Sequence, residues 1–297
     1  MSKDAKNVPA LRFKGYSDAW EKRKLREITE INPKGKIPEV FRYVDLESVK
    51  NSSIISSKIE TKQTAPSRAQ RTAEIGDVFY QTVRPYQKNN VIFLLHSSMP
   101  YVFSTGYAQL RSNMNSFFIL YLVQTDGFVN DVLNRATGTS YPAINPTHLA
   151  TIIVCFPKIV SEQNRIGQVL EHLDNLITAT QHKIDALEQA KKALLQRLFD
   201  QSWRFKGYSD PWEKRKLGEI AGIFDGTHQT PNYQSSGIMF LSVENIQTLK
   251  SNKFISLEDF QKDFKVSPRT GDILMTRIGN IGTTNVVKST RPIAYYA

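Results

Sequence analysis

The sequence has a single cysteine and no long apolar run, and each of these absences excludes a class of protein. Cys155 is the only cysteine among 297 residues, so an internal disulfide framework is impossible. No stretch reaches the roughly 18 consecutive apolar residues that a transmembrane helix requires. Residues 1–10 contain no apolar core of a secretory signal peptide. We therefore expect a cytoplasmic protein without a membrane partner.

Familiar catalytic motifs are also absent. The chain has no GxxxxGK[ST] loop for phosphates and no HExxH metal motif, and one cysteine cannot build a cysteine-based zinc cluster. We therefore expect no catalytic residue, no bound metal and no cofactor in this chain. One alternative stays open, since Asp45, Glu60 and Lys62 loosely fit the pattern of a metal-dependent nuclease.

An excess of positive charge is what the chain does have. Its 39 Lys and Arg against 28 Asp and Glu give a net charge of +11. Residues 1–160 carry +8, residues 161–202 carry −1 and residues 203–297 carry +4. A strongly basic balance favours a polyanionic partner such as nucleic acid. Because the excess lies in two flanking regions, we expect two basic lobes joined by a neutral connector.

A long internal repeat gives the domain organisation. Residues 12–28 (RFKGYSDAWEKRKLREI) and 204–220 (RFKGYSDPWEKRKLGEI) differ at only two of 17 positions. Fainter echoes follow, because the Gly-Asp pair at 76–77 and the pair at 271–272 each precede a β-prone run. An offset of this length is typical of a duplicated domain rather than a solenoid. The second copy is expected to be truncated, since the chain stops about half way through it.

Between the two copies, residues 161–201 predict one long helix. The segment has no proline, and its positions 166 to 198 follow an alternating 4,3 spacing that is apolar except at Thr180 and Lys191. A heptad sustained over this length is typical of a coiled coil. A helix of about 40 residues would reach roughly 60 Å, which exceeds a small domain. The exposed seam needs a partner, so we expect self-association or another subunit.

These pieces, taken in order, resemble the specificity subunit of type I restriction–modification enzymes. The resemblance covers essentially the whole chain and rests on the repeated WEKRKLxEI starts, the GTSYPAIN segment at 138–145, the SEQNRIGQVLEHLDNLI segment at 161–177, KKALLQRLF at 191–199, and DGTHQTPNYQSSGIMFLSVENI with GDILMTRIGNIG in the second half.

The resemblance implies a division of labour. Each target recognition domain would recognise one half of a bipartite site on double-stranded DNA, and the helices would fix the gap between the halves. Methyltransferase subunits would methylate adenine N6 with S-adenosylmethionine, and restriction subunits would translocate and cleave DNA with ATP and Mg²⁺. The specificity subunit itself would bind DNA without catalysis.

Residue chemistry suggests which segments contact DNA. Lys and Arg neutralise phosphates, whereas Arg, Asn, Gln, Ser and Thr recognise base edges. Polar stretches of this composition in loops give the expected DNA-binding residues: Ser67, Arg68, Gln70, Arg71, Gln81, Thr82, Arg84, Tyr86, Gln87, Lys88, Asn89, Asn90, Gly138, Thr139, Ser140, Thr227, His228, Gln229, Tyr233, Thr276, Arg277 and Asn280.

The sequence thus predicts an α+β protein in three parts. A target recognition domain would span residues 1–158, a coiled-coil spacer helix 159–202 and a partial second recognition domain 203–297. The alternative from another class is a stand-alone DNA-binding protein that forms a homodimer through its single helix.

Overall fold

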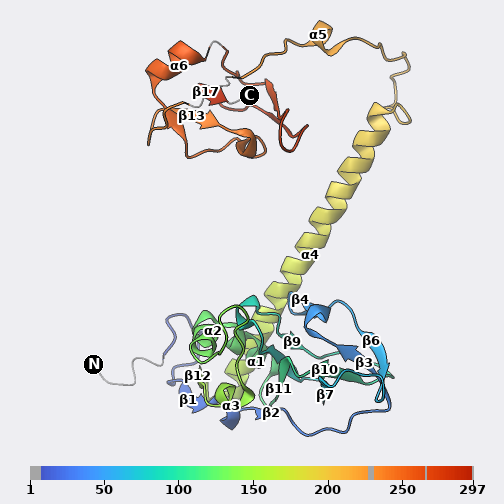
Figure 1. Cartoon of the computed structure of the whole chain (residues 1–297), viewed down its shortest axis with the longest axis vertical. Helices are drawn as coiled ribbons and strands as arrows, with labels where there is room; N and C mark the ends of the chain where they lie inside the picture. The colour runs from blue at the N-terminus through green and yellow to red at the C-terminus, as the bar shows by residue number, and fades with distance from the viewer. Residues whose placement is uncertain (1–7, 227–230, 265, 296–297) are drawn as a thin grey trace. The chain divides into compact units, whose positions relative to one another are not determined.

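The computed structural model describes residues 8–226, 231–264 and 266–295. The chain divides into two compact units, Met1–Trp203 and Arg204–Ala297. Both units mix strands with helices, and a single 40-residue helix belongs to the first unit (Figure 1). The predicted α+β class with a long helix is confirmed. Within the described residues, no helix is long and apolar enough to cross a membrane.

The first unit contains two four-stranded sheets. In spatial order, the first sheet consists of β6 (Lys58–Thr61), β3 (Val40–Val44), β10 (Tyr101–Ser104) and β7 (Ala69–Thr72). The second consists of β2 (Glu30–Ile31), β11 (Tyr107–Arg111), β8 (Val78–Gln81) and β9 (Val91–Ile92). Only the β3–β10 pair is parallel among these strands. A short hairpin pairs β4 (Val49–Lys50) with β5 (Ser53–Ile54).

Aromatic side chains join the two sheets. The rings of Phe79 on β8 and Phe103 on β10 are stacked with centroids 3.6 Å apart, and Tyr107 on β11 lies edge-on to both. All three side chains are fully buried. Aromatic pairs in these geometries add stabilisation beyond the area they bury. The Ser104–Gly106 turn links β10 to β11. It is therefore flanked on both sides by packed aromatic side chains, Phe103 and Tyr107.

A second core lies between the β8 sheet and the helices. Its helices are α1 (Ser116–Gln124), α2 (Asp126–Leu133) and α3 (Pro146–Leu149), capped by the side chains of Asn115, Thr125 and Asn145. Each cap accepts a hydrogen bond from a backbone N–H of the first turn, as helix starts require. Leu25, Val78 and Tyr80 belong to this core and are buried.

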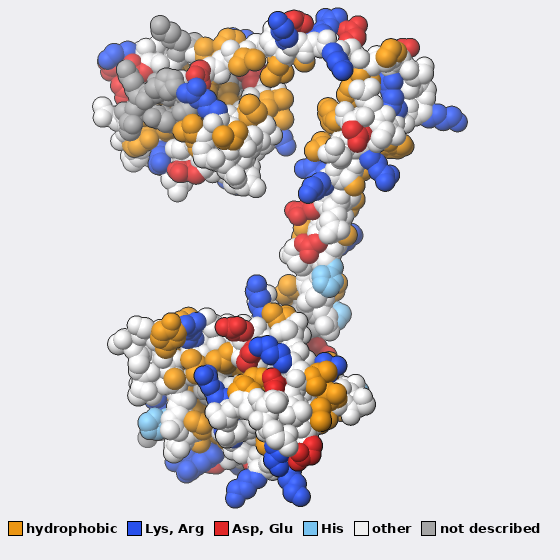
Figure 2. Space-filling view, turned by 45° about the vertical axis from the view of Figure 1, so that its right-hand side comes forward, with side chains coloured by type: hydrophobic (Ala, Val, Ile, Leu, Met, Phe, Trp, Pro, Cys, Tyr) orange, Lys and Arg blue, Asp and Glu red, His pale blue; other side chains and the backbone are white. Residues whose placement is uncertain are grey.

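The long helix α4 runs over Val160–Phe199. It follows strand β12 (Ile153–Phe156), which pairs with β1 (Glu21–Lys24). Its first turns pack on α1, where a methyl group at Gly167 would collide with Asn115 Oδ1 and lie 3.1 Å from Phe118 N. Further along, the predicted seam is open to solvent, and Figure 2 shows hydrophobic side chains along the outer part of the helix. The exposed positions include Leu173, Ile177, Ile184, Leu187 and Leu194.

The second unit builds a smaller version of the first sheet. Strand β13 (Ile238–Leu241) pairs in parallel with β17 (Ile293–Tyr295) and antiparallel with β14 (Phe254–Ile255). A separate hairpin joins β15 (Ile273–Met275) to β16 (Thr284–Val286). The helices of this unit are α5 (Leu217–Ile220) and α6 (Leu257–Asp263).

The Gly-Asp turn has the same geometry in both units. Asp77 Oδ2 accepts a hydrogen bond from Glu74 N at 2.7 Å, and Asp272 Oδ2 accepts one from Arg269 N at 2.8 Å. The intervening glycines have φ values of 92° and 97°, a left-handed conformation that glycine adopts without strain. The faint sequence echo between the two halves therefore corresponds to one repeated turn.

Candidate DNA-recognition surface

Three of the predicted polar stretches are linked in the first unit: two bond to the Ser104–Gly106 turn, and the third bonds to one of these two. Thr105 N donates a hydrogen bond to Arg68 O at 2.8 Å, which holds the 67–71 stretch on one side. On the other side, Thr82 donates to Gly106 O through both its backbone N (2.9 Å) and its Oγ1 (2.8 Å). The 82–88 stretch in turn contacts the 138–143 loop, because Arg84 N donates to Pro142 O at 2.7 Å.

Arg84 occupies an unusual backbone conformation. Arg84 and Lys88 flank the short 3-10 helix η4 (Pro85–Gln87), and both have φ of 53°. Left-handed conformations are uncommon for residues other than glycine, and they cluster at functional sites. The guanidinium of Arg84 lies 4.2 Å from the centroid of the Tyr141 ring, a cation–π contact. The half-exposed guanidinium of Arg84 therefore lies against the exposed ring of Tyr141.

The 138–140 loop is exposed and tightly folded. Gly138 has φ of 91°, and a Cβ at this position would lie 3.0 Å from Tyr141 O. Thr137 and Ala143 exchange backbone hydrogen bonds of 2.9 Å that close the loop. Only glycine fits a left-handed turn with so close a backbone approach. Gly138, Thr139 and Ser140 therefore present exposed backbone next to Arg84 and Tyr141.

The fold uses several of the predicted polar side chains internally. Gln81, Thr82 and Asn90 are buried. Asn90 Oδ1 accepts from Gln81 N at 2.8 Å, and Gln81 Nε2 donates to Gln87 Oε1 at 2.9 Å. Gln81 Oε1 accepts from the backbone N of half-buried Asn89 at 3.3 Å. Because these three side chains are buried, Gln81, Thr82 and Asn90 are not open to a ligand.

Lys88 pairs with an acidic side chain of α2. Its Nζ lies 2.6 Å from Asp126 Oδ1, and this hydrogen bond lowers the pKa of the Asp126 carboxyl group. Tyr86 and Gln87, on the turn between Arg84 and Lys88, are exposed. Within this loop, the side chains open to a ligand are thus Arg84, Tyr86 and Gln87, with Lys88 partly neutralised.

In the 67–71 stretch three side chains are exposed, Ala69 is buried and Arg71 is half-buried. Ser67, Arg68 and Gln70 are exposed, and Gln70 Nε2 donates to Ser67 O at 2.7 Å. Arg71 is half-buried, its Nε is buried without a hydrogen-bond partner, and burial lowers the pKa of its guanidinium. Arg68 is therefore the most accessible cation of this stretch.

The predicted residues of the second unit are more scattered. Thr227, His228 and Gln229 lie outside the described residues. Thr276 is buried and its Oγ1 donates to Asn280 O, so this threonine stabilises the β15–β16 turn. The side chains of Tyr233, Arg277 and Asn280 are exposed. Arg277 Nη1 lies 3.3 Å from Asp225 Oδ2, and Lys253 Nζ lies 5.4 Å from the centroid of the Tyr233 ring.

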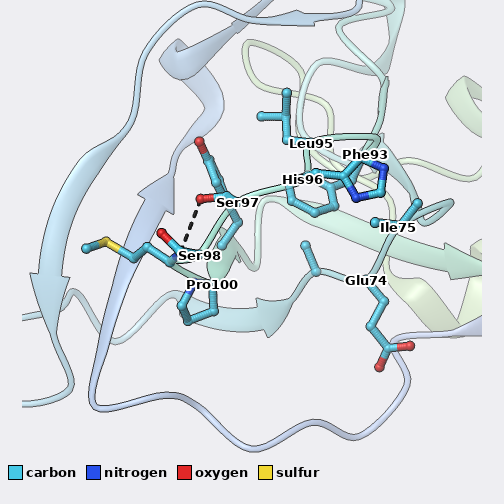
Figure 3. Close-up of a pocket in the computed structure, with 11 residues that line it drawn as sticks. Glu74, Ile75, Phe93, Leu95, His96, Ser97, Ser98 and Pro100 are labelled. Atoms are coloured by element: carbon cyan, nitrogen blue, oxygen red, sulfur yellow. Dashed lines mark hydrogen bonds between the residues drawn. The ribbon is translucent and has the colours of Figure 1, made fainter.

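One hollow in the first unit is lined by other residues. It has a volume of about 690 Å³, and its walls include Glu74, Ile75, Phe93, Leu95 and His96. Figure 3 shows the apolar and hydroxyl side chains around it, with Met99 N donating to Ser97 Oγ at 3.2 Å. None of the predicted DNA-binding residues lines it. This hollow therefore lies outside the predicted surface.

The nuclease alternative is not favoured by the geometry. Asp45 and Glu60 do line one hollow, but Asp45 Oδ1 caps a 3-10 helix by accepting from Glu47 N and Ser48 N. The Nζ of Lys62 instead lies 3.6 Å from Glu39 Oε1. Among the described residues, no group of three or more His, Cys, Asp and Glu side chains is arranged to hold a metal ion.

Sequence reasoning missed Tyr141 as a member of the surface. Tyr141 is exposed and supports Arg84, which precedes it by 57 positions. The only signal in the sequence was an aromatic residue directly after the polar residues Gly138-Thr139-Ser140. The Thr105–Gly106 turn was also missed. It lies between two mostly apolar strand sequences, and no residue pattern there indicates a ligand-binding turn.

Comparison with known proteins decides the family. The family model described as the type I restriction modification DNA specificity domain matches residues 17–189. This chain belongs to that family. The resemblance to specificity subunits seen in the sequence is therefore confirmed.

Individual members of the family are distant in sequence. The MjaX specificity subunit of a type I restriction enzyme from Methanocaldococcus jannaschii is 23% identical over 217 residues, which is 68% of this chain and 49% of that relative. The chain thus spans about half the length of this specificity subunit.

Solved structures of specificity subunits share the fold. The HsdS subunit from Thermoanaerobacter tengcongensis aligns with a TM-score of 0.50 and 24% identity, covering 97% of this chain and 75% of the other. The S subunit from M. genitalium aligns with a TM-score of 0.57 and 12% identity, covering 97% and 72%.

Proposed function

We propose that this type I DNA specificity protein recognises a bipartite site on double-stranded DNA, with one half recognised by each unit. Partner methyltransferase subunits would then methylate adenine N6 with S-adenosylmethionine, and restriction subunits would translocate and cleave with ATP and Mg²⁺. In this proposal the chain itself holds no cofactor and acts in the cytoplasm, where the DNA is found.

The observation that carries the proposal is the linkage of three polar stretches in the first unit, two of which bond to the Ser104–Gly106 turn. The linked stretches and their loop carry two accessible cations, Arg68 and Arg84, together with the exposed side chains of Tyr86, Gln87 and Tyr141. Arginine forms bidentate hydrogen bonds with guanine, and amides do so with adenine. Exposed backbone at 138–140 allows close approach to phosphates.

Helix α4 suits the spacer role in this proposal. A 40-residue helix spans about 60 Å at about 1.5 Å per residue. Its outer seam is apolar and exposed, so another helix is expected to cover it. In the restriction–modification complex, that face would bind a spacer helix and the methyltransferase subunits.

A second candidate function also follows from the exposed seam. The chain could act alone as a DNA-binding protein whose two copies pair through α4 and recognise a symmetric site. Sedimentation tests this candidate, because a well-folded monomer at high concentration excludes the homodimer. Co-purification with a methyltransferase subunit favours the specificity-subunit function instead.

Methylome sequencing tests the proposed function directly. Cells that carry the modification subunit would be compared with and without this chain. We expect N6-methyladenine at a two-part motif only in cells that contain the chain. An identical methylome in both strains contradicts the proposal, and a single uninterrupted motif contradicts its bipartite part.

A further inference from the structure

Another hollow of the first unit adjoins the linked polar stretches. It has a volume of about 380 Å³, and its walls include Glu60, Arg68 and Ser104. Ser104 begins the turn whose Thr105 N donates to Arg68 O, so the hollow shares residues with the candidate DNA-recognition surface. This hollow is here called the Glu60 pocket. It also contains Asp45, so two of the three residues in the nuclease pattern line it without a role in the proposed function.

Strand register brings two charged side chains to this pocket. In the β3–β6 pair, Phe41 lies opposite Glu60 and Tyr43 lies opposite Lys58. Opposite residues of an antiparallel pair share one face of the sheet. Glu60 and Lys58 therefore lie on the face that also carries the buried Phe41 and Tyr43. Because β6 is at the edge of its sheet, both charged side chains reach the pocket from that edge.

The carboxylate of Asp45 is engaged on both of its oxygens. Oδ1 caps the 3-10 helix η3 (Leu46–Ser48) by accepting from Glu47 N at 3.1 Å and from Ser48 N at 3.0 Å. Oδ2 lies 3.7 Å from Lys58 Nζ. Glu47 also lines the pocket, but it is exposed, and within the described residues no hydrogen bond orients its side chain. Asp45 therefore serves the fold, and Glu47 has no fixed orientation.

Glu60, in contrast, is an oriented acceptor with one open oxygen. Its Oε2 accepts from Thr64 Oγ1 at 2.8 Å. Thr64 Oγ1 in turn lies 3.1 Å from Thr61 Oγ1 and accepts from Thr61 N at 3.1 Å. Among the residues that the structure describes, no donor reaches Oε1, and Glu60 is half-buried. Neighbouring hydrogen bonds that lock a side chain in this way prepare it to accept one further bond.

Arg68 supplies donors to the same pocket. It is exposed, and in the described part of the chain its guanidinium has no acidic partner. Its backbone is fixed, because Arg68 O accepts from Thr105 N at 2.8 Å. A guanidinium carries a planar fork of N–H donors and no acceptor. The Glu60 pocket therefore presents one oriented acceptor and one fork of donors.

We propose that the Glu60 pocket recognises a C·G base pair in the major groove. Glu60 would accept from the amino group at N4 of cytosine, and Arg68 would donate to O6 and N7 of guanine. These groups are the ones that a C·G pair presents in the major groove, and carboxylate and guanidinium are their matching partners. The inference rests on the proposed function, because it requires the first unit to bind double-stranded DNA.

A carboxylate on a surface that meets DNA needs such a donor. Phosphates repel Glu60, so it weakens binding to every sequence in which no base donates to it. Thymine has the acceptor O4 where cytosine has its amino group, so a T·A pair would place two acceptors against each other. Glu60 therefore selects mainly by rejecting other bases, while Arg68 selects by attraction.

Binding curves with single base-pair changes test the assignment. The full chain, with its methyltransferase subunit, would be titrated with the motif found by methylome sequencing, in which each C·G pair is changed in turn to T·A. At one pair this change should weaken wild-type binding by about tenfold or more, as loss of one base contact does. Glu60→Gln should reduce that preference to less than about threefold, because an amide also donates to thymine O4.

Arg68→Gln and two control variants sharpen the test. Arg68→Gln should lose preference at the same base pair as Glu60→Gln. Glu39→Gln and Lys62→Gln should change no base preference, because these two side chains pair with each other at 3.6 Å and neither lines the pocket.

A modified base tests the inference in the wild-type protein, independently of any variant. N4-methylcytosine still pairs with guanine, but its methyl group replaces the N–H that points into the major groove. Placed at the sensitive pair, it should weaken wild-type binding about as much as T·A does. Unchanged affinity for this duplex would overturn the role of Glu60 as acceptor.

The remaining outcomes separate this inference from the proposed function. Identical methylomes with and without the chain contradict both. A defined motif whose base preferences are the same in wild type and Glu60→Gln overturns only the Glu60 pocket. So does a Glu60→Gln variant that binds every sequence more tightly by the same factor, since Glu60 would then only repel phosphates.

Discussion

Strands β8 and β15 occupy equivalent places after the same Gly-Asp turn, yet their surroundings differ. In the first unit, Val78 and Tyr80 are 1% and 0% exposed. Their strand pairs with β11 and β9, and their side chains pack in the core that includes helix residues. In the second, their counterparts Ile273 and Met275 are 68% and 62% exposed, and among the described residues β15 pairs with β16 alone. The other face of the strand is buried in both units, at Phe79 and at Leu274.

This contrast separates structure that forms from local hydrogen bonds from structure that requires tertiary packing. The Gly-Asp turn forms in both units because glycine, the aspartate side chain and nearby backbone groups supply its hydrogen bonds. Burial of the apolar strand face depends on segments distant in sequence, such as α1 and β11. Duplicated sequence therefore guarantees duplicated turns but not a duplicated core.

Truncating the equivalent residues Tyr80 and Met275 gives the largest expected contrast. We expect Tyr80→Ala to lower the stability of the first unit by about 3–5 kcal/mol, since it removes a buried aromatic ring. Met275→Ala should change the second unit by less than about 0.5 kcal/mol, as exposed substitutions usually do. Hydrogen exchange resolved by peptide measures each unit separately.

Tyr80→Phe is the control for that comparison. The Tyr80 hydroxyl is buried without a hydrogen-bond partner, and burial raises its pKa. Removing the hydroxyl should leave stability nearly unchanged or improve it. A large loss in Tyr80→Phe, or equal losses in the two alanine variants, would contradict the difference in burial.

Substituting alanine for Gly167 in α4 and for Gly218 in α5 compares the packing around the two helices. Gly167→Ala should destabilise the first unit by about 1–3 kcal/mol, because the methyl group meets Asn115 and the backbone of Phe118. At Gly218 in α5, an added methyl group would have no neighbouring atom within 4 Å, so Gly218→Ala should be neutral or stabilising by up to about 1 kcal/mol. Chemical denaturation checks both, and an unchanged Gly167→Ala would exclude close packing of α1 on α4.

Arginines that follow the equivalent strands test recognition in each unit. Arg84→Ala should weaken specific DNA binding by about 1–3 kcal/mol if Arg84 is bidentate to guanine, and should relax preference within one half-site. Arg277→Ala should have a smaller effect, because Asp225 already offsets its charge. Binding curves at fixed salt, with Lys183→Gln on α4 as the charge-matched control, measure these effects; equal losses in all three would indicate non-specific attraction.

The smallest effect is expected on the outer part of α4. Leu187→Gln should change the stability of the isolated chain by less than about 0.5 kcal/mol, because Leu187 is exposed. The same variant should weaken pairing with any helix that covers the seam. A strong loss of stability in dilute monomer would mean that the seam is already packed.

Periodic and repeated features were predictable from the sequence. The 4,3 spacing predicted helix 159–202, and the structure has α4 at Val160–Phe199, so the difference is confined to the helix ends. The family also followed from the residues. The two Gly-Asp turns were identified because their hydrogen bonds are local.

The candidate surface was harder to predict, since it depends on contacts across the chain. Gln81 and Asn90 have the composition of an exposed loop, but the end of β8 needs hydrogen-bond partners and these amides supply them. The cation–π contact between Arg84 and Tyr141 joins two loops that are 57 positions apart in the sequence. No periodicity encodes such a contact.

Selection from a pool of random duplex oligonucleotides tests the central claim most directly. The purified chain would be used with and without a methyltransferase subunit, and the bound DNA would be sequenced. We expect enrichment of a defined motif, with its first half lost in Arg84→Ala. Recovery of unselected sequence under both conditions would contradict DNA recognition by this chain.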